Sequence, residues 1–300
     1  FVLAGGTFIA MVLAVVVPIL RGPSATEAAP PSPWTTLFSP VVVELRGLAV
    51  VSNQVAWASG ASGTVLRTID GKDWKVVPVP GAEALDFRDI EAWDAQTAVA
   101  MSIGPGEASN VYKTTDGGLT WRKVFANTEP TGFWDAISFR DRKSGALFGD
   151  PVRGRFQVFT TQDGGETWTA APEAGMPMAL ANEGGFAASG SCLTSGPDGR
   201  LAFVTGGAIE ARVFVSTDGG RTFRVSTSPV PTGAPSKGLF SALWLDANTL
   251  LTVGGDYRER VLPGVNAGLS ADSGARWTAV NAQPIGFLSS VVRGPSKDAA

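Results

Sequence analysis

The stretch that decides the fold is Thr-Thr-Asp-Gly-Gly-Leu-Thr-Trp at residues 114–121. The same spacing of aspartate, glycine pair and aromatic returns at residues 161–168 and 216–223. A degenerate copy occupies residues 270–277, and a copy one residue shorter occupies residues 68–74. The five aspartates are 46, 47, 55 and 54 residues apart: Asp70, Asp116, Asp163, Asp218 and Asp272. A motif that recurs about every 50 residues is typical of an array of similar small units.

Each copy of the motif predicts a tight turn between two strands. The aspartate side chain can accept hydrogen bonds from turn amides, and the glycines supply the positive φ that such turns need. The aromatic that follows begins the next strand and can bury its ring against a neighbouring sheet. We therefore expect structural rather than catalytic roles for the aspartates, and largely buried positions for Trp74, Trp121, Trp168, Phe223 and Trp277.

The segments between the turns repeat as well. Each unit contains four short runs rich in Val, Phe, Trp and Thr, and the units span residues 45–77, 87–125, 133–171, 186–226 and 240–280. Four short strands per unit are typical of the blades of a β-propeller. The sequence therefore predicts an all-β fold in which residues 34–300 form a single propeller domain.

Two fragments outside these units bear on the number of blades. Residues 285–292 are expected to form the first strand of a sixth unit, and residues 34–37 are similar to a fourth strand. The latter could complete the last blade and remove exposed sheet edges, or Trp34 could simply pack beneath the ring. We expect six blades, the last incomplete in this chain, with seven blades as the alternative.

The N-terminal segment predicts export. Residues 8–20 are apolar and uncharged, and Arg21 opens a Pro/Ala-rich linker over residues 21–33. Residues 1–20 have about the length of a signal peptide core or a minimal membrane anchor. Either interpretation predicts a periplasmic or extracellular protein, with any membrane attachment through residues 1–20.

The amino-acid composition argues against several classes of function. The net charge is −3 and there is no basic run, so a nucleic-acid surface is not expected. The absence of histidine excludes Ser-His-Asp and Cys-His catalysis and every His-ligated metal site. The single cysteine, Cys192, lies in an apolar, glycine-rich run and is expected to be a core residue. We expect a monomer with no metal, no cofactor and no catalytic residue.

The candidate functional residues lie in loops opposite the repeated turns. In a propeller blade, the loops from the second to the third strand share a face with the connections to the next blade. These loops and connections contain the candidate ligand- or partner-binding residues Asp150, Arg153, Arg155, Glu183 at the rim, Asp256, Tyr257 and Arg258. Arginines beside carboxylates suit a polar or anionic ligand or a mixed-charge protein surface. Alternatively, Asp150 and Asp256 cap turns and pair with nearby arginines.

The turn motifs resemble the Asp-box, or BNR repeat, of sialidase-like propellers. With the blade spacing and the export signal, the chain is similar to the photosystem II assembly-factor family and its bacterial relatives. That resemblance implies a non-enzymatic assembly factor of the lumen or periplasm, with a protein partner in a membrane complex.

A glycoside hydrolase is the alternative that the resemblance leaves open. A resemblance to sialidases implies an active site with an arginine triad, a tyrosine activated by a glutamate, and an aspartate. Only Tyr257 is placed to act here, because Tyr112 lies in a strand leading into a repeated turn. The Phe-Arg-Ile-Pro motif is absent, and residues 44–47 come nearest to it. Two carboxylates such as Asp150 and Asp256 could serve another hydrolase at the mouth of the central channel.

Overall fold

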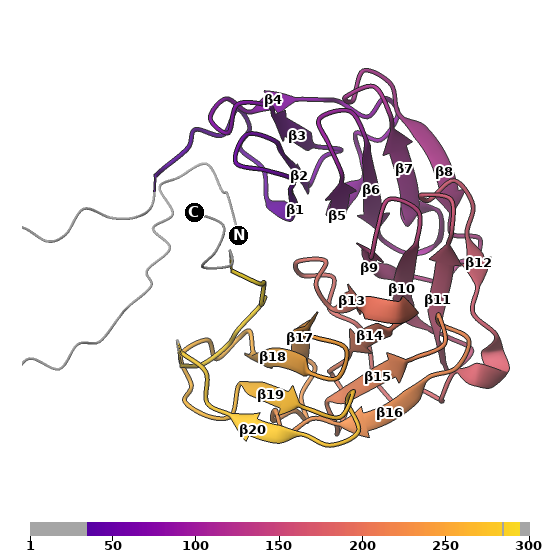
Figure 1. Cartoon of the computed structure of the whole chain (residues 1–300), viewed down its shortest axis with the longest axis vertical. Helices are drawn as coiled ribbons and strands as arrows, with labels where there is room; N and C mark the ends of the chain where they lie inside the picture. The colour runs from indigo at the N-terminus through magenta and orange to yellow at the C-terminus, as the bar shows by residue number, and fades with distance from the viewer. Residues whose placement is uncertain (1–34, 284, 295–300) are drawn as a thin grey trace, which may run out of the picture.

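The computed structural model describes residues 35–283 and 285–294. Five four-stranded antiparallel sheets follow one another along the chain, and Figure 1 shows them side by side in an arc around a central axis. The inner strands of successive sheets are neighbours in space. The described residues outside the strands include three short 3-10 turns, at Gly106–Ala108, Glu173–Gly175 and Pro197–Gly199.

In each blade the strands are hydrogen-bonded in the order of the sequence. Blade one contains β1 (Leu45–Val50), β2 (Ala56–Gly60), β3 (Val65–Thr68) and β4 (Lys75–Val76). Blade two contains β5 (Asp86–Ala92), β6 (Ala98–Ile103), β7 (Asn110–Thr114) and β8 (Arg122–Ala126). Blade three contains β9 (Trp134–Phe139), β10 (Gly145–Val152), β11 (Arg155–Thr161) and β12 (Thr169–Ala170). Blade four contains β13 (Leu193–Ser195), β14 (Leu201–Val204), β15 (Arg212–Ser216) and β16 (Arg224–Thr227). Blade five contains β17 (Lys237–Trp244), β18 (Leu250–Asp256), β19 (Ala267–Ser270) and β20 (Thr278–Val280).

The predicted all-β blade architecture is confirmed for these five units. Blade four begins later than expected, at Leu193 rather than at residue 186. The reason is tertiary: the glycine-rich residues 184–192 run against Asp89 of blade two and against Asp135 and Asp150 of blade three, instead of forming a continuous ladder with β14.

The predicted strand over residues 285–292 is wrong for the described residues. This segment makes single hydrogen bonds to blade five, from Leu288 N–H to the Gly254 carbonyl (3.0 Å) and from Val291 N–H to the Ser241 hydroxyl (3.1 Å). Isolated bonds of this kind do not make the continuous ladder that defines a strand. Residues 35–37 also form no strand. Trp34, residues 1–20 and the linker at residues 21–33 lie outside the described residues, so the sixth blade stays a prediction.

The repeated turns are closed by their aspartates. In the turn from β7 to β8, Asp116 Oδ1 accepts hydrogen bonds from the Thr120 amide (2.9 Å) and the Thr114 hydroxyl (2.8 Å). The Thr120 hydroxyl donates to Oδ2 (2.5 Å). These bonds favour the charged form and lower the pKa of Asp116 to about 2. Gly117 and Gly118 have φ of 79° and 84°, the left-handed region expected for this turn.

The same carboxylate bonds recur in the other blades. Asp163 and Asp218 accept from the hydroxyl and amide of Thr167 and Thr222, at 2.5–2.9 Å. Asp272 accepts instead from the Arg276 amide (2.8 Å) and guanidinium (2.7 Å). In the shorter copy, Asp70 accepts from the amides of residues 72 and 73 (2.9 and 2.8 Å). The turn chemistry predicted from the motif is therefore present in all five described blades.

The aromatic side chains after the turns pack between blades, but less deeply than expected. Trp121 meets Trp57 of blade one edge-on, with ring centroids 6.3 Å apart. Trp168 stacks on Phe125 of blade two at 6.0 Å. Only Phe223 is fully buried, whereas the four tryptophans are half-buried. The fourth strand is the outermost strand of its blade, which leaves part of each tryptophan in contact with solvent.

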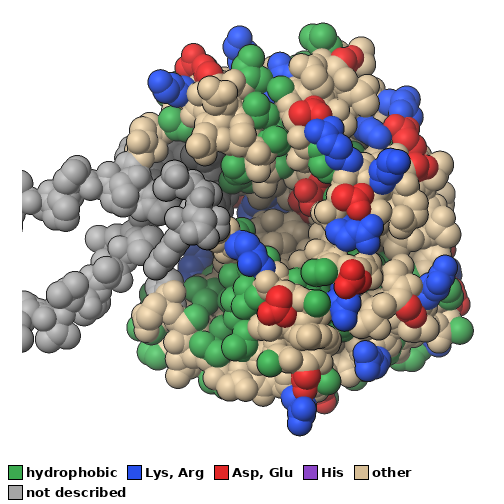
Figure 2. All heavy atoms as spheres, in the orientation of Figure 1, with side chains coloured by type: hydrophobic (Ala, Val, Ile, Leu, Met, Phe, Trp, Pro, Cys, Tyr) green, Lys and Arg blue, Asp and Glu red, His purple; other side chains and the backbone are tan. Residues whose placement is uncertain are grey.

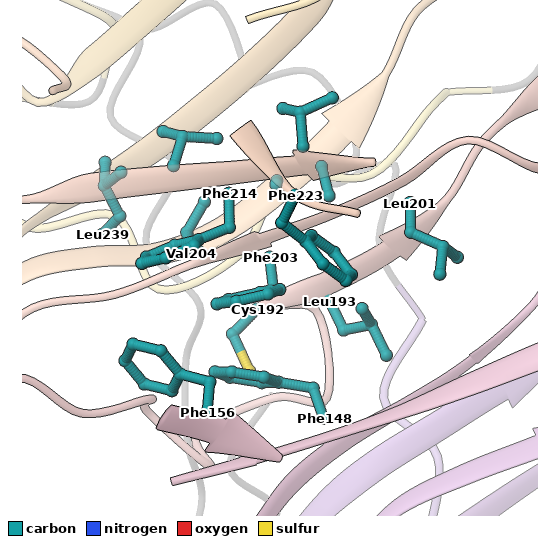
Figure 3. Close-up of a cluster of buried hydrophobic side chains, with 14 of the residues drawn as sticks. Phe148, Phe156, Cys192, Leu193, Leu201, Phe203, Val204, Phe214, Phe223 and Leu239 are labelled. Atoms are coloured by element: carbon teal, nitrogen blue, oxygen red, sulfur yellow. The ribbon is translucent and has the colours of Figure 1, made fainter. Parts of the chain in front are cut away.

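The largest core cluster joins blades three, four and five (Figure 3). Phe148 of β10 stacks on Phe203 of β14 with centroids 4.3 Å apart, and Phe203 stacks on Phe214 of β15 at 4.5 Å. Cys192 is fully buried in the same cluster, as its apolar context predicted. Stacked and edge-on rings add to the burial energy of such an interface.

We expect the Trp168→Ala variant to lose about 3 kcal/mol of unfolding free energy, the lower end of the range for a buried aromatic. The half-buried indole contacts Phe125 and Phe139 and donates from Nε1 to the Gly165 carbonyl (3.1 Å). Urea unfolding measures the loss. Leu119→Ala is the control, since Leu119 lies in the equivalent turn of blade two and is 85% exposed. Equal unfolding midpoints for the two variants would show that the rings do not hold the blades together.

Candidate functional site

The strand order gives the ring two distinct faces. Because neighbouring strands are antiparallel, the turns from the third to the fourth strand emerge at the same end of a blade as the turns from the first to the second. We call this end the turn face. The loops from the second to the third strand and the connections between blades emerge at the other end, which we call the loop face. Figure 2 shows one view of the ring, with cationic and anionic side chains interspersed around a central hollow.

Arg153 projects from the loop face of blade three. It occupies the two-residue turn between β10 and β11 with φ of 51°, followed by Gly154 at 78°, as expected for a tight hairpin. Its guanidinium donates from two nitrogens to the two carboxylate oxygens of Glu129 (2.9 and 3.0 Å). The side chain nevertheless remains 68% exposed. Arg155 donates from Nε to the Glu173 carbonyl (3.0 Å). The turn thus presents an arginine whose geometry is already fixed.

The second group of candidates lies in the loop from β18 to β19 of blade five. Asp256 Oδ1 accepts a hydrogen bond from the Arg258 amide (2.9 Å), which is the turn-capping role considered from the sequence. The exposed Tyr257 ring packs edge-on against Phe240 with centroids 6.2 Å apart. The Arg258 guanidinium lies 5.9 Å from the centre of the Tyr257 ring. Of the three candidates in this loop, Tyr257 and Arg258 are exposed, whereas Asp256 is partly buried.

Glu183 is not at the rim, contrary to the sequence-based expectation. It is buried, and its carboxylate accepts hydrogen bonds from Arg212 Nε (2.9 Å) and the Thr205 hydroxyl (2.6 Å). Arg212 Nη2 also bonds to Glu183 and to the Met178 carbonyl. A buried charge needs such a partner, so the pair fixes the connection between blades three and four rather than meeting a ligand. The burial of Arg212 could not be predicted, because the sequence does not show which charges face inward.

Carboxyl groups also gather where the inner strands line the channel. Asp89 is buried and accepts from the amides of Ile90 (2.9 Å) and Ile137 (2.8 Å). Burial raises its pKa to about 7, and burial together with the Asp89 charge raises the pKa of Glu91 to about 8. Asp135 is also buried, and burial and the charge of Asp150 place its pKa well above the usual range. These pKa shifts are consequences of burial, which the sequence does not show.

The glycine-rich segment at residues 184–192 covers these carboxyl groups. Asp150 accepts a hydrogen bond from the Gly185 amide (2.8 Å), and burial raises its pKa. A Cβ on Gly190 would lie 2.3 Å from Asp89 Oδ1, so only glycine allows this approach. Asp150 therefore holds the segment in place, and its remaining capacity to contact a partner is smaller than that of Arg153.

The geometry thus separates the seven candidates into two groups on different blades and two anchoring carboxylates, Asp150 and Glu183. Arg153 and Arg155 lie on blade three, whereas Asp256, Tyr257 and Arg258 lie on blade five. Sequence reasoning missed exposed apolar side chains that accompany them on the loop face: Met178, Ile209, Val261 and Leu262. No cluster of possible metal ligands occurs within residues 35–283 and 285–294. None of the helical segments in that part of the chain is long and apolar enough to cross a membrane.

Comparison with known proteins finds similar solved structures but no matching family model. No family model and no curated protein matches the sequence. Among solved structures, YCF48 from Cyanidioschyzon merolae is 14% identical with a TM-score of 0.49, covering 85% of this chain and 90% of that one. The GH74 enzyme of Niastella koreensis is 18% identical with a TM-score of 0.52, covering 81% of this chain and 32% of that one. A putative TolB from Agrobacterium tumefaciens is 14% identical with a TM-score of 0.51, covering 80% and 81%.

The likenesses to the GH74 enzyme and the putative TolB show the fold and no more, because both identities are low. The chain has a β-propeller fold, with five described blades, and is similar in fold to the GH74 enzyme and to the putative TolB. Propellers of this kind serve unrelated functions, so the function must be argued from the loop face itself.

The channel carboxyls predict an unusual pH dependence of stability. Asp89 and Glu91 release their protons near pH 7 and 8 in the folded protein but near pH 4 when unfolded. The folded state therefore binds more protons between these limits, and stability falls as pH rises through this window. We expect the melting temperature to decrease from about pH 5 to 8, and to decrease less in Glu91→Gln.

Thermal melts across this pH range measure the effect. Glu107→Gln serves as the control, because Glu107 is exposed on a loop of blade two. Parallel melting curves for wild type, Glu91→Gln and Glu107→Gln would contradict the assignment.

Proposed function

We propose that this protein is an exported, non-enzymatic binding propeller, similar in role to an assembly factor, whose loop face docks a protein partner of the cell envelope. The observation that carries the proposal is the combination of exposed apolar and arginine side chains on that face. Ile209 and Val261 are each 80% exposed, and Leu262 and Met178 are also exposed. They come from the β14–β15 loop, the β18–β19 loop and the connection after β12, which all emerge at one end of the blades.

This composition is that of a protein-binding surface. Interfaces combine an apolar centre with tyrosine and arginine anchors and a polar rim. Arg153 is held by Glu129 before any partner arrives, and Tyr257 is held by Phe240. Side chains that are already ordered lose less conformational entropy on binding, which favours affinity. In this proposal Arg153, Arg155, Tyr257 and Arg258 contact the partner, while Asp150 and Asp256 hold their loops.

A hydrolase remains the second candidate because two carboxyls, Asp135 and Asp150, interact electrostatically near the channel. A carboxyl whose pKa is raised by burial can act as a general acid in glycoside hydrolysis. Asp135 is buried beneath the segment at residues 184–192, which argues against substrate access. Turnover of a glycoside that is lost in Asp150→Asn, or in Tyr257→Phe, would replace the binding proposal with this one.

The binding proposal is tested with the Arg153→Ala/Arg258→Ala double variant. If both arginines form hydrogen-bonded pairs across the interface, their removal should weaken capture of the partner by about 2 kcal/mol or more, roughly thirtyfold. The measurement is an affinity pull-down from the envelope of the native organism, followed by titration of the captured protein.

The matched control is Lys75→Ala/Arg224→Ala, which also removes two positive charges. Lys75 and Arg224 are exposed on the outer strands β4 and β16, away from the loop face. Loss of capture only in the Arg153/Arg258 variant supports the proposal. Equal capture by both double variants would place the contact elsewhere.

Export is tested separately by expressing the protein with its natural start and fractionating the cells. The apolar run at residues 8–20 should carry it across the membrane, so the protein should be found outside the cytoplasm, attached or released. Replacing Leu13 and Val16 by arginine should retain it inside, because charges in such a run block insertion. A wholly cytoplasmic pool of the unaltered protein would remove this part of the proposal.

A further inference from the structure

A pocket opens on the turn face between blades three and four, on the opposite side of the ring from the proposed docking surface. Its polar side chains include Arg140, Ser144, Thr160, Gln162 and Arg200. Arg140 lies in the turn after β9, and Arg200 lies directly before β14. Neither the repeated turns nor the proposed function uses them.

Both arginines line the pocket, and the Arg140 side chain extends toward the residue that precedes Arg200. A Cβ built on Gly199, the residue before Arg200, would lie 3.7 Å from Arg140 Nη1. Arg140 Nε and Nη2 donate to Asp141 Oδ2 (3.1 and 2.9 Å), and Nη2 also donates to the Ser144 hydroxyl (3.0 Å). These bonds fix the guanidinium plane and leave Nη1 on the side of Gly199.

Arg200 is the unbalanced member of the pair. Its Nε is buried and has no hydrogen-bond acceptor among the described residues. Within that part of the chain, its one carboxylate at ion-pair distance is Asp198, 3.7 Å from Nη1 and 81% exposed. A buried N–H of a charged group without an acceptor is costly, and native proteins seldom leave one. An anion seated in the pocket would bring a counter-charge to this incompletely paired guanidinium.

Further donors and open space complete the pocket. Gln162 Oε1 accepts from the Ser144 hydroxyl (3.1 Å), which leaves the amide NH₂ group of Gln162 as a donor. Gly219 also lines the pocket, and a Cβ built there would meet nothing within 4 Å. Donors therefore converge from β9–β10, from the turn after β11 and from β14, around a space that no side chain fills.

We propose that this pocket binds a tetrahedral oxyanion, phosphate or sulfate, between Arg140 and Arg200. Guanidinium groups match the oxygen spacing of such anions and bond to two oxygens at once. The Asp141 carboxylate offsets the charge of Arg140, whereas Arg200 is only loosely compensated, so the pocket retains an attraction for a negative charge.

The test is isothermal titration of the purified protein with inorganic phosphate and with sulfate, at an ionic strength held constant with chloride. Arg200→Gln and Arg140→Gln should each weaken binding at least about tenfold. Arg224→Gln, which removes an exposed arginine from the same blade, should bind as the wild type does. Circular dichroism checks that each variant is folded. If the Arg200 variant does not fold, the Arg140 variant alone provides the test.

A second readout is the melting temperature, which phosphate should raise in the wild type and in Arg224→Gln only, since a ligand stabilises the state that binds it. Phenyl phosphate distinguishes a free ion from a phosphate group carried on a larger molecule, because tighter binding of the ester would identify the latter. If neither phosphate nor sulfate binds at a concentration of about 10 mM, which is ten times a dissociation constant of about 1 mM, the proposal is overturned. Undiminished binding by both pocket variants would overturn it as well.

Discussion

The aspartate carboxylate in each repeated turn is the interaction on which the rest of the structure depends. In the turn of blade two, Asp116 accepts from the hydroxyl and amide of Thr120 and from the Thr114 hydroxyl, which locks the path from β7 into β8. That path sets the position of Trp121, whose ring meets Trp57 of the preceding blade. The glycine pair allows the close approach, because a Cβ on Gly118 would lie 2.7 Å from the Cβ of Val77 in blade one. One local network thus determines both the fourth strand and the packing between blades.

The two faces of the propeller differ in their chemistry. On the turn face, the repeated aspartates are engaged by their own turns and serve the fold. On the loop face, the connections are held from within by the buried Glu183–Arg212 pair and by the bond between Asp150 and the Gly185 amide. With those anchors in place, Arg153, Tyr257 and the apolar loop residues can stay exposed without loosening the ring. The proposed docking role follows from that division between interior anchors and exposed side chains.

The fold could be predicted from the sequence because its determinants are local. The turn motif, its spacing and the alternation of short apolar runs lie within single units, and four of the five observed blades begin within about three residues of expectation. Blade four was misplaced because the inward course of residues 184–192 depends on contacts with Asp89, which is distant in the sequence. The predicted strand over residues 285–292 was wrong for a similar reason, since pairing depends on a neighbour and not on composition alone.

The candidate site was only partly predictable. Topology alone placed Arg153, Tyr257 and Arg258 on the loop face, but the burial of Glu183 depends on Arg212, which lies 29 residues later and must fold against it. Exposed apolar residues such as Ile209 and Val261 are indistinguishable from core residues in the sequence, because exposure is a property of the folded chain. The acceptor-free Nε of Arg200 is hidden from sequence analysis in the same way.

The most direct measurement of the central claim is photocrosslinking from one residue on each face. A photoreactive amino acid would replace Leu262 on the loop face in one variant and Leu119 on the turn face in another; both side chains are exposed and apolar. Irradiation in the native envelope should link a defined protein partner to the variant altered at residue 262 and not to the variant altered at residue 119. Crosslinking from residue 119 alone would contradict the assignment of the loop face as the docking surface.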